Sequence, residues 1–129
     1  MSDSERGSAR LERERQVMAD ALQHAARGHT VAVVLHRYSM AVKPLHRMAA
    51  GMVEEGAEWR VSHLHGAERI DHASFGRVLF FGGPTYIRGL MADVLVVSDQ
   101  LGVHDMEDLM PALESSEVGE LVFLRDAHG

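Results

Sequence analysis

The stretch Thr30-Val-Ala-Val-Val-Leu35 is an uninterrupted apolar run that is rich in β-branched residues. Such a run is too short for a helix and is apolar on both faces, which is typical of a central parallel strand covered by helices above and below. A second run of the same kind, Arg77-Val-Leu-Phe-Phe81, follows further along the chain. Two doubly buried strands predict the α/β class, a parallel sheet with helices on both faces.

The elements around the first strand follow from the spacing of apolar residues. Residues 9–27 carry apolar side chains at helical spacing and stop before Gly28, which predicts an amphipathic helix. Residues 44–55 begin with Pro44, which is tolerated in the first turn of a helix, and continue with three- and four-residue apolar spacing. Residues 58–64 alternate apolar and polar side chains, as an edge strand with one wet face does.

The second half of the chain predicts a continuation of the same alternation. Residues 65–76 are expected to form the crossover connection to the strand at 77–81. Residues 90–101 have apolar positions that fit a helix ending at Gly102, residues 105–113 fit a short helical piece, and residues 119–124 fit a fourth strand. Ligands of such a sheet bind in the crevice beyond the carboxyl ends of its strands.

Length and composition limit the classes of protein. A chain of 129 residues holds one core, so we expect an N-terminal helix at 1–28 and a single α/β domain at 29–129. The formal charge of −6 argues against a nucleic-acid binder, and no apolar run approaches the roughly 20 residues of a membrane helix. The polar N-terminus is no secretory signal and cysteine is absent, so we expect a cytoplasmic protein.

The second buried strand continues into a loop that resembles the flavodoxin family. Val78-Leu-Phe-Phe-Gly-Gly-Pro-Thr-Tyr86 is similar to the strand and loop of flavodoxins and of the quinone reductases related to the tryptophan-repressor-binding protein. In that family a Gly-x-Pro-Thr-Tyr loop lies against the isoalloxazine ring of flavin mononucleotide (FMN). The resemblance implies a flavin contact at Pro84, Thr85, Tyr86 and Ile87.

The end of the first strand resembles the start of the same family's phosphate loop. The segment Leu35-His-Arg-Tyr-Ser-Met40 implies phosphate contacts at Tyr38, Ser39 and Met40, with Lys43 as a direct charge partner. The family continues with a glycine and a hydroxyl residue, whereas this chain has Val42 and then Pro44, which has no N–H to donate. The phosphate loop is therefore degenerate.

The resemblance covers residues 30–124 and implies a particular topology. It is a three-layer, flavodoxin-like parallel sheet with strand order 2-1-3-4 and helices on both faces, in which the fifth strand and the last helix are missing. The helix at 9–27 is extra to the family. It has the length to cover the sheet face that the last helix would have covered.

The function implied by the resemblance is an FMN-binding oxidoreductase or electron carrier. Electrons would pass from a reduced nicotinamide or a protein donor to a quinone-like acceptor, and no side chain would act as an acid, a base or a nucleophile. The alternative is a degenerate flavodoxin-like module without flavin that acts as a binding or scaffold protein. An amphipathic helix or an uncovered edge strand of such a module can form a homodimer.

Other patterns have plainer interpretations. Tyr86 fits the edge of the core as well as a flavin ring, and Ser39 fits an N-terminal helix cap. His63 and His65 have a metal-like spacing, but no third ligand is evident, so a solvated edge strand is favoured. The sequence has no Gly-x-Ser-x-Gly elbow, no Gly-x-Gly-x-x-Gly fingerprint and no Walker loop. A receiver domain is excluded because the strand ends lack acidic residues.

Overall fold

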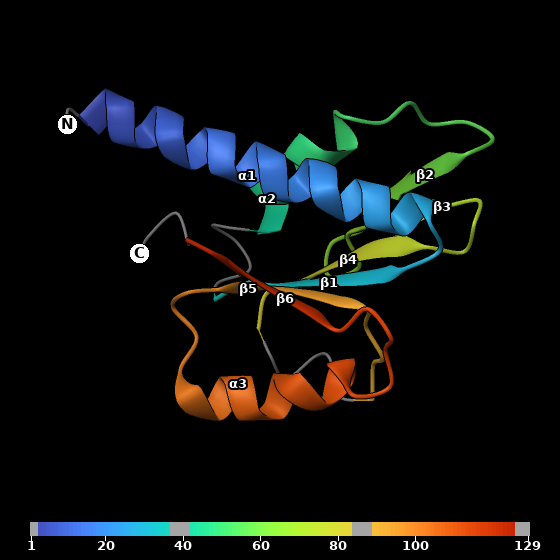
Figure 1. The fold of residues 1–129 in the computed structure, drawn as a ribbon. Coiled ribbons are helices and arrows are strands. Elements are labelled where there is room, and N and C mark those ends of the chain that lie inside the picture. The colour runs from blue at the N-terminus through green and yellow to red at the C-terminus, as the bar shows by residue number, and fades with distance from the viewer. Residues whose placement is uncertain (1–2, 37–41, 84–88, 126–129) are drawn as a thin grey trace.

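The structure is a computed structural model, and it describes residues 3–36, 42–83 and 89–125, with side chains from residue 7 onward. Its strands are β1 (Thr30–Val34), β2 (Trp59–Ser62), β3 (Arg69–His72), β4 (Arg77–Phe81), β5 (Val94–Ser98) and β6 (Glu120–Leu124). Its helices are α1 (Asp3–Ala26), α2 (Lys43–Ala50), α3 (Val103–Leu109) and a 3₁₀ helix, η3 (Met110–Leu113). The strands form one six-stranded sheet in the order β2-β3-β4-β1-β5-β6 (Figure 1).

The centre of the sheet is parallel, and the α/β class expected from the sequence is confirmed. β1 pairs in parallel with β4 on one side and with β5 on the other, and β5 pairs in parallel with β6. Val31, Ala32, Val33 and Val34 are fully buried, because helices cover both faces of this strand. The β-branched run at residues 30–35 therefore lies where its composition places it.

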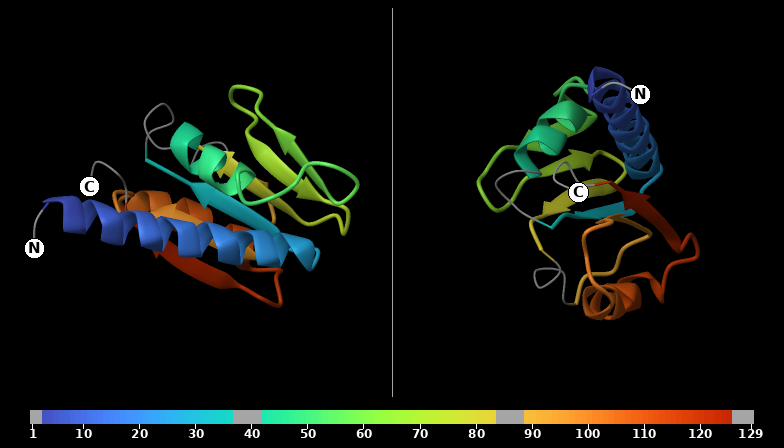
Figure 2. Two further views of the ribbon diagram at one scale, coloured as in Figure 1. Left: turned by 90° about the horizontal axis from the view of Figure 1, so that it is seen from above. Right: turned by 90° about the vertical axis from the view of Figure 1, so that its left-hand side faces the viewer.

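The two helical layers enclose two parts of the core. α1 and α2 lie side by side on one face, and α3 with η3 lies on the other (Figures 1 and 2). Met18 of α1 and Val33 belong to the first part of the core, whereas Val34 and Leu109 belong to the second. The expected N-terminal helix therefore covers one face of the sheet. It ends at Ala26, and Gly28 follows with a φ of +89°, a conformation that glycine adopts at little cost.

One half of the sheet differs from the expected parallel arrangement. Residues 65–76, expected to be a crossover connection, contain β3, which pairs antiparallel with both β2 and β4. The β3–β4 connection is a tight turn in which the N–H of His72 donates to the O of Gly76 (2.9 Å). β3 is short, and Ile70 is its only fully buried residue, so this part of the sequence has no clear apolar periodicity. The strand was therefore not predicted from the sequence.

Residues 90–101, expected to be a helix, instead contain the buried strand β5. All five residues of β5 are buried between β1 and β6. A run that is apolar at every position satisfies helical spacing as well as strand spacing, so periodicity alone was misleading, and the β-branched Val94, Val96 and Val97 favour the strand. The second predicted helix is also shorter than expected, since α2 ends at Ala50.

The expected strand order 2-1-3-4 is therefore wrong. The first and third expected strands, β1 and β4, are neighbours as predicted. The strand at residues 59–62 lies at the edge as predicted, but β3 and β4 separate it from β1. The last strand, β6, lies on the far side of β1, with β5 between them. No helix among the described residues has the length and apolar character needed to cross a membrane.

Candidate functional site

The carboxyl ends of β4, β1 and β5 lie at one edge of the sheet because these strands are parallel. This carboxyl edge carries His36 after β1, Gly82 and Gly83 after β4, and Ser98 and Asp99 at the end of β5. The edge is also the end of the molecule at which the N-terminal half of α1 extends past the sheet (Figures 1 and 2). In sheets of this class, the crevice beyond the carboxyl ends is where ligands bind.

Lys43, the single lysine of the chain, is the first residue of α2 and lies beside this edge. Its Nζ lies 3.9 Å from Oε2 of Glu68, and it donates a hydrogen bond to the backbone O of His63 at 3.5 Å. α2 is the helix that follows β1 in the chain, and the contacts of Lys43 with Glu68 and His63 set the position of its ammonium group. Lys43 therefore supplies a positive charge at the carboxyl edge.

Glu68 and His46 form a buried polar pair of residues next to Lys43. The carboxylate of Glu68 is fully buried, and its backbone O accepts a hydrogen bond from the N–H of Phe80, the fourth residue of β4. The ring of His46 is also buried. Its centroid lies 5.1 Å from the ring centroid of His63 and 5.2 Å from the ring centroid of Phe80. A buried carboxylate needs a nearby positive charge, which Lys43 provides.

The surroundings of His46 favour the neutral form of its imidazole. Burial lowers the pKa of His46, and the charges of His63 and Lys43 act in the same direction, while a backbone hydrogen bond at Arg69 and the charge of Glu68 oppose them. Its Nε2 atom has no hydrogen-bond partner within the described part of the chain. His46 is therefore a buried ring in surroundings that disfavour its charged form.

The end of β5 adds an acidic residue to the carboxyl edge. The Oγ of the buried Ser98 accepts a hydrogen bond from the N–H of Gln100 at 3.1 Å. The N–H of Asp99 donates to the O of Leu124 at 2.9 Å, which ties the end of β5 to the end of β6. Because β5 is the direct neighbour of β1, the exposed Asp99 lies on the same edge as the β1–α2 connection.

Most of the residues expected to form the flavin site lie outside the described part of the chain. These are Tyr38, Ser39, Met40, Pro84, Thr85, Tyr86 and Ile87. Lys43 is described, and it lies at the carboxyl edge. Sequence reasoning missed Glu68, because only the fold brings it to Lys43, and it missed His46, although His46 lies one helical turn after Lys43 on α2. It also missed the place of Asp99, because the segment was taken for a helix; the run of four apolar residues before Ser98 was the available signal.

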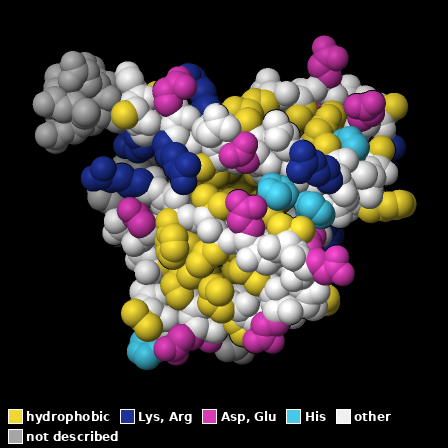
Figure 3. All heavy atoms as spheres, in the orientation of Figure 1, with side chains coloured by type: hydrophobic (Ala, Val, Ile, Leu, Met, Phe, Trp, Pro, Cys, Tyr) yellow, Lys and Arg dark blue, Asp and Glu magenta, His cyan; other side chains and the backbone are white. Residues whose placement is uncertain are grey.

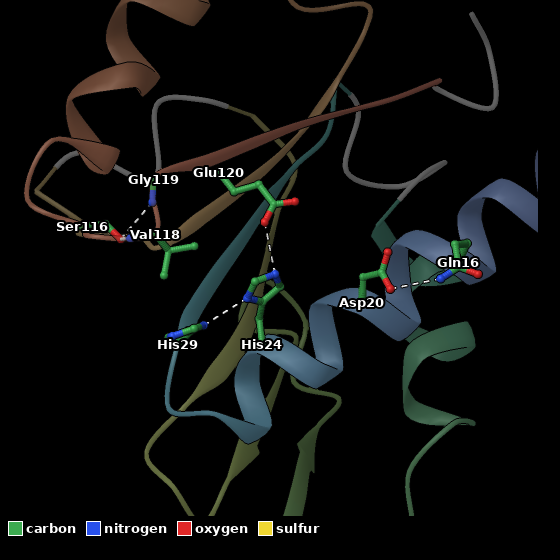
Figure 4. Close-up of polar contacts among 8 residues, drawn as sticks. All are labelled: Gln16, Asp20, His24, His29, Ser116, Val118, Gly119 and Glu120. Atoms are coloured by element: carbon green, nitrogen blue, oxygen red, sulfur yellow. Dashed lines mark hydrogen bonds and ion pairs between the residues drawn. The ribbon is translucent and has the colours of Figure 1, made fainter.

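The opposite edge of the sheet carries a second polar network (Figure 4). Nε2 of His24 lies 3.2 Å from Oε2 of Glu120, and Nδ1 of His24 lies 3.0 Å from Nδ1 of His29. Asp93 accepts hydrogen bonds from the Oγ of Ser116 at 2.6 Å and from the N–H of Thr30 at 2.8 Å. These contacts join the end of α1 to the starts of β1, β5 and β6, so their role is structural.

A groove of about 150 Å³ lies between α1 and the strands β5 and β6. Val94, Val96 and Val122 line it from the sheet, and Arg13 and Asp20 line it from α1. Figure 3 shows this face, with hydrophobic side chains gathered below α1. Within the described ranges, no three His, Cys, Asp or Glu side chains are placed to hold a metal ion.

Comparisons with known proteins identify the fold. The chain belongs by its architecture to the α/β proteins with a mainly parallel central sheet. No family model and no curated protein matches it. It is similar to the large terminase of a thermophilic bacteriophage in complex with ADP, with a TM-score of 0.51, 12% identity, and 76% of this chain and 25% of that chain covered. The same terminase in complex with ATP-γ-S matches with a TM-score of 0.50 and 11% identity, and 74% of this chain and 24% of that chain are covered.

These likenesses concern the fold, and the chain spans about a quarter of the length of the terminase chains it matches. They correct the resemblance to the flavodoxin family, which is wrong, and with it the expected FMN oxidoreductase, the electron-transfer role and the flavin cofactor. The physical reason lies at residues 94–98. A flavodoxin-like chain would place a helix after the Gly-Gly-Pro-Thr-Tyr loop, whereas this chain forms β5 there. Gly and Pro end strands in many folds, so the loop alone was not specific.

Proposed function

We propose that this chain binds an adenine nucleotide at the carboxyl edge of β4, β1 and β5. The observation that supports the proposal most directly is Lys43, a cation at the first turn of the helix that follows the central strand. A terminase with a similar fold was solved with ADP and with ATP-γ-S. A nucleotide carries the negative charge that a single lysine at this edge attracts.

Each part of the carboxyl edge has a role in this proposal. Lys43 contacts a phosphate group as a point charge. Asp99 holds the Mg²⁺ ion that accompanies the nucleotide, since an acidic residue after a buried strand has that role in nucleotide-binding sheets. Gly82 and Gly83 carry no side chains, so the ligand can approach the backbone after β4.

The residues before α2 fit binding better than hydrolysis. Val42 precedes the helix with φ −66° and ψ −53° and offers no side-chain cap, and Pro44 has no N–H to direct at a phosphate. The sequence holds no Gly-x-x-x-x-Gly-Lys-Ser/Thr motif, which cradles the phosphates of hydrolysed nucleotides. The proposal is therefore binding of the nucleotide, without a hydrolytic step.

Glu68 competes with the nucleotide for Lys43. The carboxylate of Glu68 lies 3.9 Å from the ammonium group, so a phosphate must share or replace this contact. Replacing the carboxylate by an amide of the same shape removes the competing charge. We therefore expect Glu68→Gln to bind ADP more tightly than the unchanged chain by about tenfold or more, because charge-assisted contacts contribute about 1.5–3 kcal/mol and every ~1.4 kcal/mol is a factor of ten.

Isothermal titration calorimetry with ADP and ATP-γ-S, each with and without Mg²⁺, tests the proposal. Lys43→Ala should weaken binding about tenfold or more, because it removes the cation. The double variant Lys43→Ala, Glu68→Gln avoids leaving a buried carboxylate without its lysine. Arg27→Ala is the matched control, since Arg27 is an exposed cation at the opposite edge of the sheet.

Two results would contradict the proposal. One is the absence of heat of binding for both nucleotides at millimolar concentration with a correctly folded protein. The other is binding that Arg27→Ala weakens as much as Lys43→Ala does, since that would indicate a non-specific response to charge. Circular dichroism of every variant checks the fold.

A further inference from the structure

The two outer strands of the sheet differ in how their free edges are covered. At β2, the N–H of Gly56 donates to the O of Trp59 at 3.0 Å and the N–H of Val61 donates to Oε1 of Glu55 at 3.1 Å, so the chain itself covers this edge. Of the residues that the structure describes, only those of β5 pair with β6. Natural sheets cover or charge their edges because open N–H and C=O groups pair with other strands. The outer edge of β6 is therefore the one with which a further strand can pair.

The groups that β6 presents at its open edge follow from its pairing with β5. The N–H of Glu120 donates to the O of Asp93 at 3.0 Å, and the O of Leu124 accepts from the N–H of Asp99 at 2.9 Å. Alternation along a strand then directs residues 120, 122 and 124 toward β5. The N–H and C=O groups of Leu121 and Phe123 point away from the sheet and are the ones that a further strand would meet.

We propose that a second copy of this chain pairs with this edge, β6 against β6 and antiparallel, about a two-fold axis at Val122. In that register Leu121 of each copy lies opposite Phe123 of the other, and each such pair exchanges both of its N–H···O bonds. All outward groups of the two strands are then matched. A register centred on Leu121 or on Phe123 would pair one of these residues with a residue outside β6. This inference does not rest on the proposed nucleotide site.

Charge favours the antiparallel arrangement of two copies. The strand begins with an acidic residue, Glu120, and is followed by a basic one, Arg125. Antiparallel pairing brings the acidic end of each strand to the basic end of the other, whereas parallel pairing would bring like charges together. The same surface on both copies forms the contact, as a two-fold axis requires.

Exposed apolar side chains on the α3 side of the sheet support the same contact. Phe123 is 54% exposed and Leu121 is half-buried against the core beneath the sheet. Figure 3 shows hydrophobic side chains gathered around β6 and toward α3. In the dimer, Phe123 of one copy packs on Leu121 of the other, which removes the exposed ring from water. One pair of five-residue strands makes a small interface, so the association should depend on concentration.

Sedimentation velocity of the full chain over a wide concentration range tests the proposal. The unchanged chain should shift from monomer to dimer as concentration rises. Phe123→Glu should remain monomeric, because it places charges in the apolar contact. Phe75→Glu is the matched control: Phe75 is 92% exposed at the β3–β4 turn, away from β6, and its substitution should leave the dimer intact.

Hydrogen exchange of the unchanged chain gives a second readout that does not depend on a variant. The amides of Leu121 and Phe123 should become more protected as concentration rises, while those of Val122 and Leu124, already bonded to β5, should change little. A chain that stays monomeric throughout, a dimer that Phe123→Glu leaves intact, or outward amides whose protection is independent of concentration would each overturn the proposal.

Discussion

Gly76 lies where the β3–β4 turn passes the C-terminal end of α1. A Cβ atom at this position would collide with the backbone of Ala25, which belongs to the helix and cannot move independently. We expect Gly76→Ala to lower the free energy of unfolding by about 2–3 kcal/mol, because overpacking against backbone forces the helix away from the turn. Urea unfolding measures this change.

Gly56 provides the control for this substitution. A Cβ at Gly56 would meet no atom within 4 Å, and its φ is not in the left-handed region. Gly56→Ala should therefore change the free energy of unfolding by less than about 1 kcal/mol. Equal effects of the two substitutions would show that α1 does not pass the turn as described.

Asp93 predicts how stability depends on pH. Burial raises the pKa of Asp93, but hydrogen bonds from Ser116 and Thr30 and the charges of His29 and His24 outweigh burial and hold the pKa below its ordinary value of 3.8. The unfolded state therefore binds the proton first as pH falls. The contribution of Asp93 is present above pH 3.8 and is lost as pH falls through the lowered pKa of the folded protein.

Ser116→Ala removes one of the hydrogen bonds that lower this pKa. At pH 7 the variant should be less stable by about 1 kcal/mol, and its deficit relative to the unchanged chain should shrink as the medium becomes acidic. Urea unfolding at neutral and acidic pH measures both effects. The neighbouring, exposed Ser115 supplies a control, Ser115→Ala. A deficit that stays constant with pH would contradict the role given to Asp93.

At the scale of elements, α1 supplies much of the cover of one sheet face. Its buried residues Val17, Met18, Ala21 and Leu22 belong to the same cluster as Val31 and Val33 of β1. Deleting residues 1–28 should therefore unfold the domain, because this face of the sheet would be exposed to water. Circular dichroism and thermal unfolding test this expectation.

A shorter deletion is the control, because it shortens α1 without removing the side chains of α1 that cover the core. Residues 7–16 contribute no side chain to the buried core, so deletion of residues 1–9 should leave the thermal unfolding midpoint almost unchanged. If deletion of residues 1–28 left the midpoint unchanged as well, α1 would not be part of the core.

The sequence was sufficient for some elements and not for others, for physical reasons. β1 and β4 were predictable because their β-branched and aromatic runs are bounded by glycine, polar and turn residues. β5 was not, because an all-apolar run fits both periods, and β3 was not, because four mainly polar residues carry no clear pattern. Their absence from the expected topology made the strand order wrong.

The candidate site shows the same division. Lys43 was predictable as a cation after the first strand, because Pro44 marks the start of the next helix in the sequence. Glu68 was not predictable, since a residue buried beside Lys43 through pairing of β3 with β4 leaves no local signal, whereas the spacing of His46 from Lys43 on α2 was available in the sequence. Side chains that meet only through the fold need the structure to be found.

At the scale of the whole molecule, the amino and carboxyl edges of the sheet, at the two ends of its parallel strands, carry different sets of polar groups. The amino edge is closed by the contact of His24 with Glu120 (Figure 4) and by the hydrogen bonds of Asp93 with Ser116 and Thr30, which together join α1, β1, β5 and β6. The carboxyl edge carries Lys43 and Asp99, with the buried His46 beside Lys43. The first edge stabilises the fold, and the second edge is the one at which we propose that a nucleotide binds.

Nuclear magnetic resonance of ¹⁵N-labelled protein during titration with Mg-ADP tests the central claim most directly. The account predicts saturable amide shift changes at the carboxyl edge, at His36, Lys43, Gly83 and Asp99, with little change at Thr30, Asp93 and Ser116 of the amino edge. The absence of shift changes at millimolar Mg-ADP, or shifts confined to the amino edge, would contradict it.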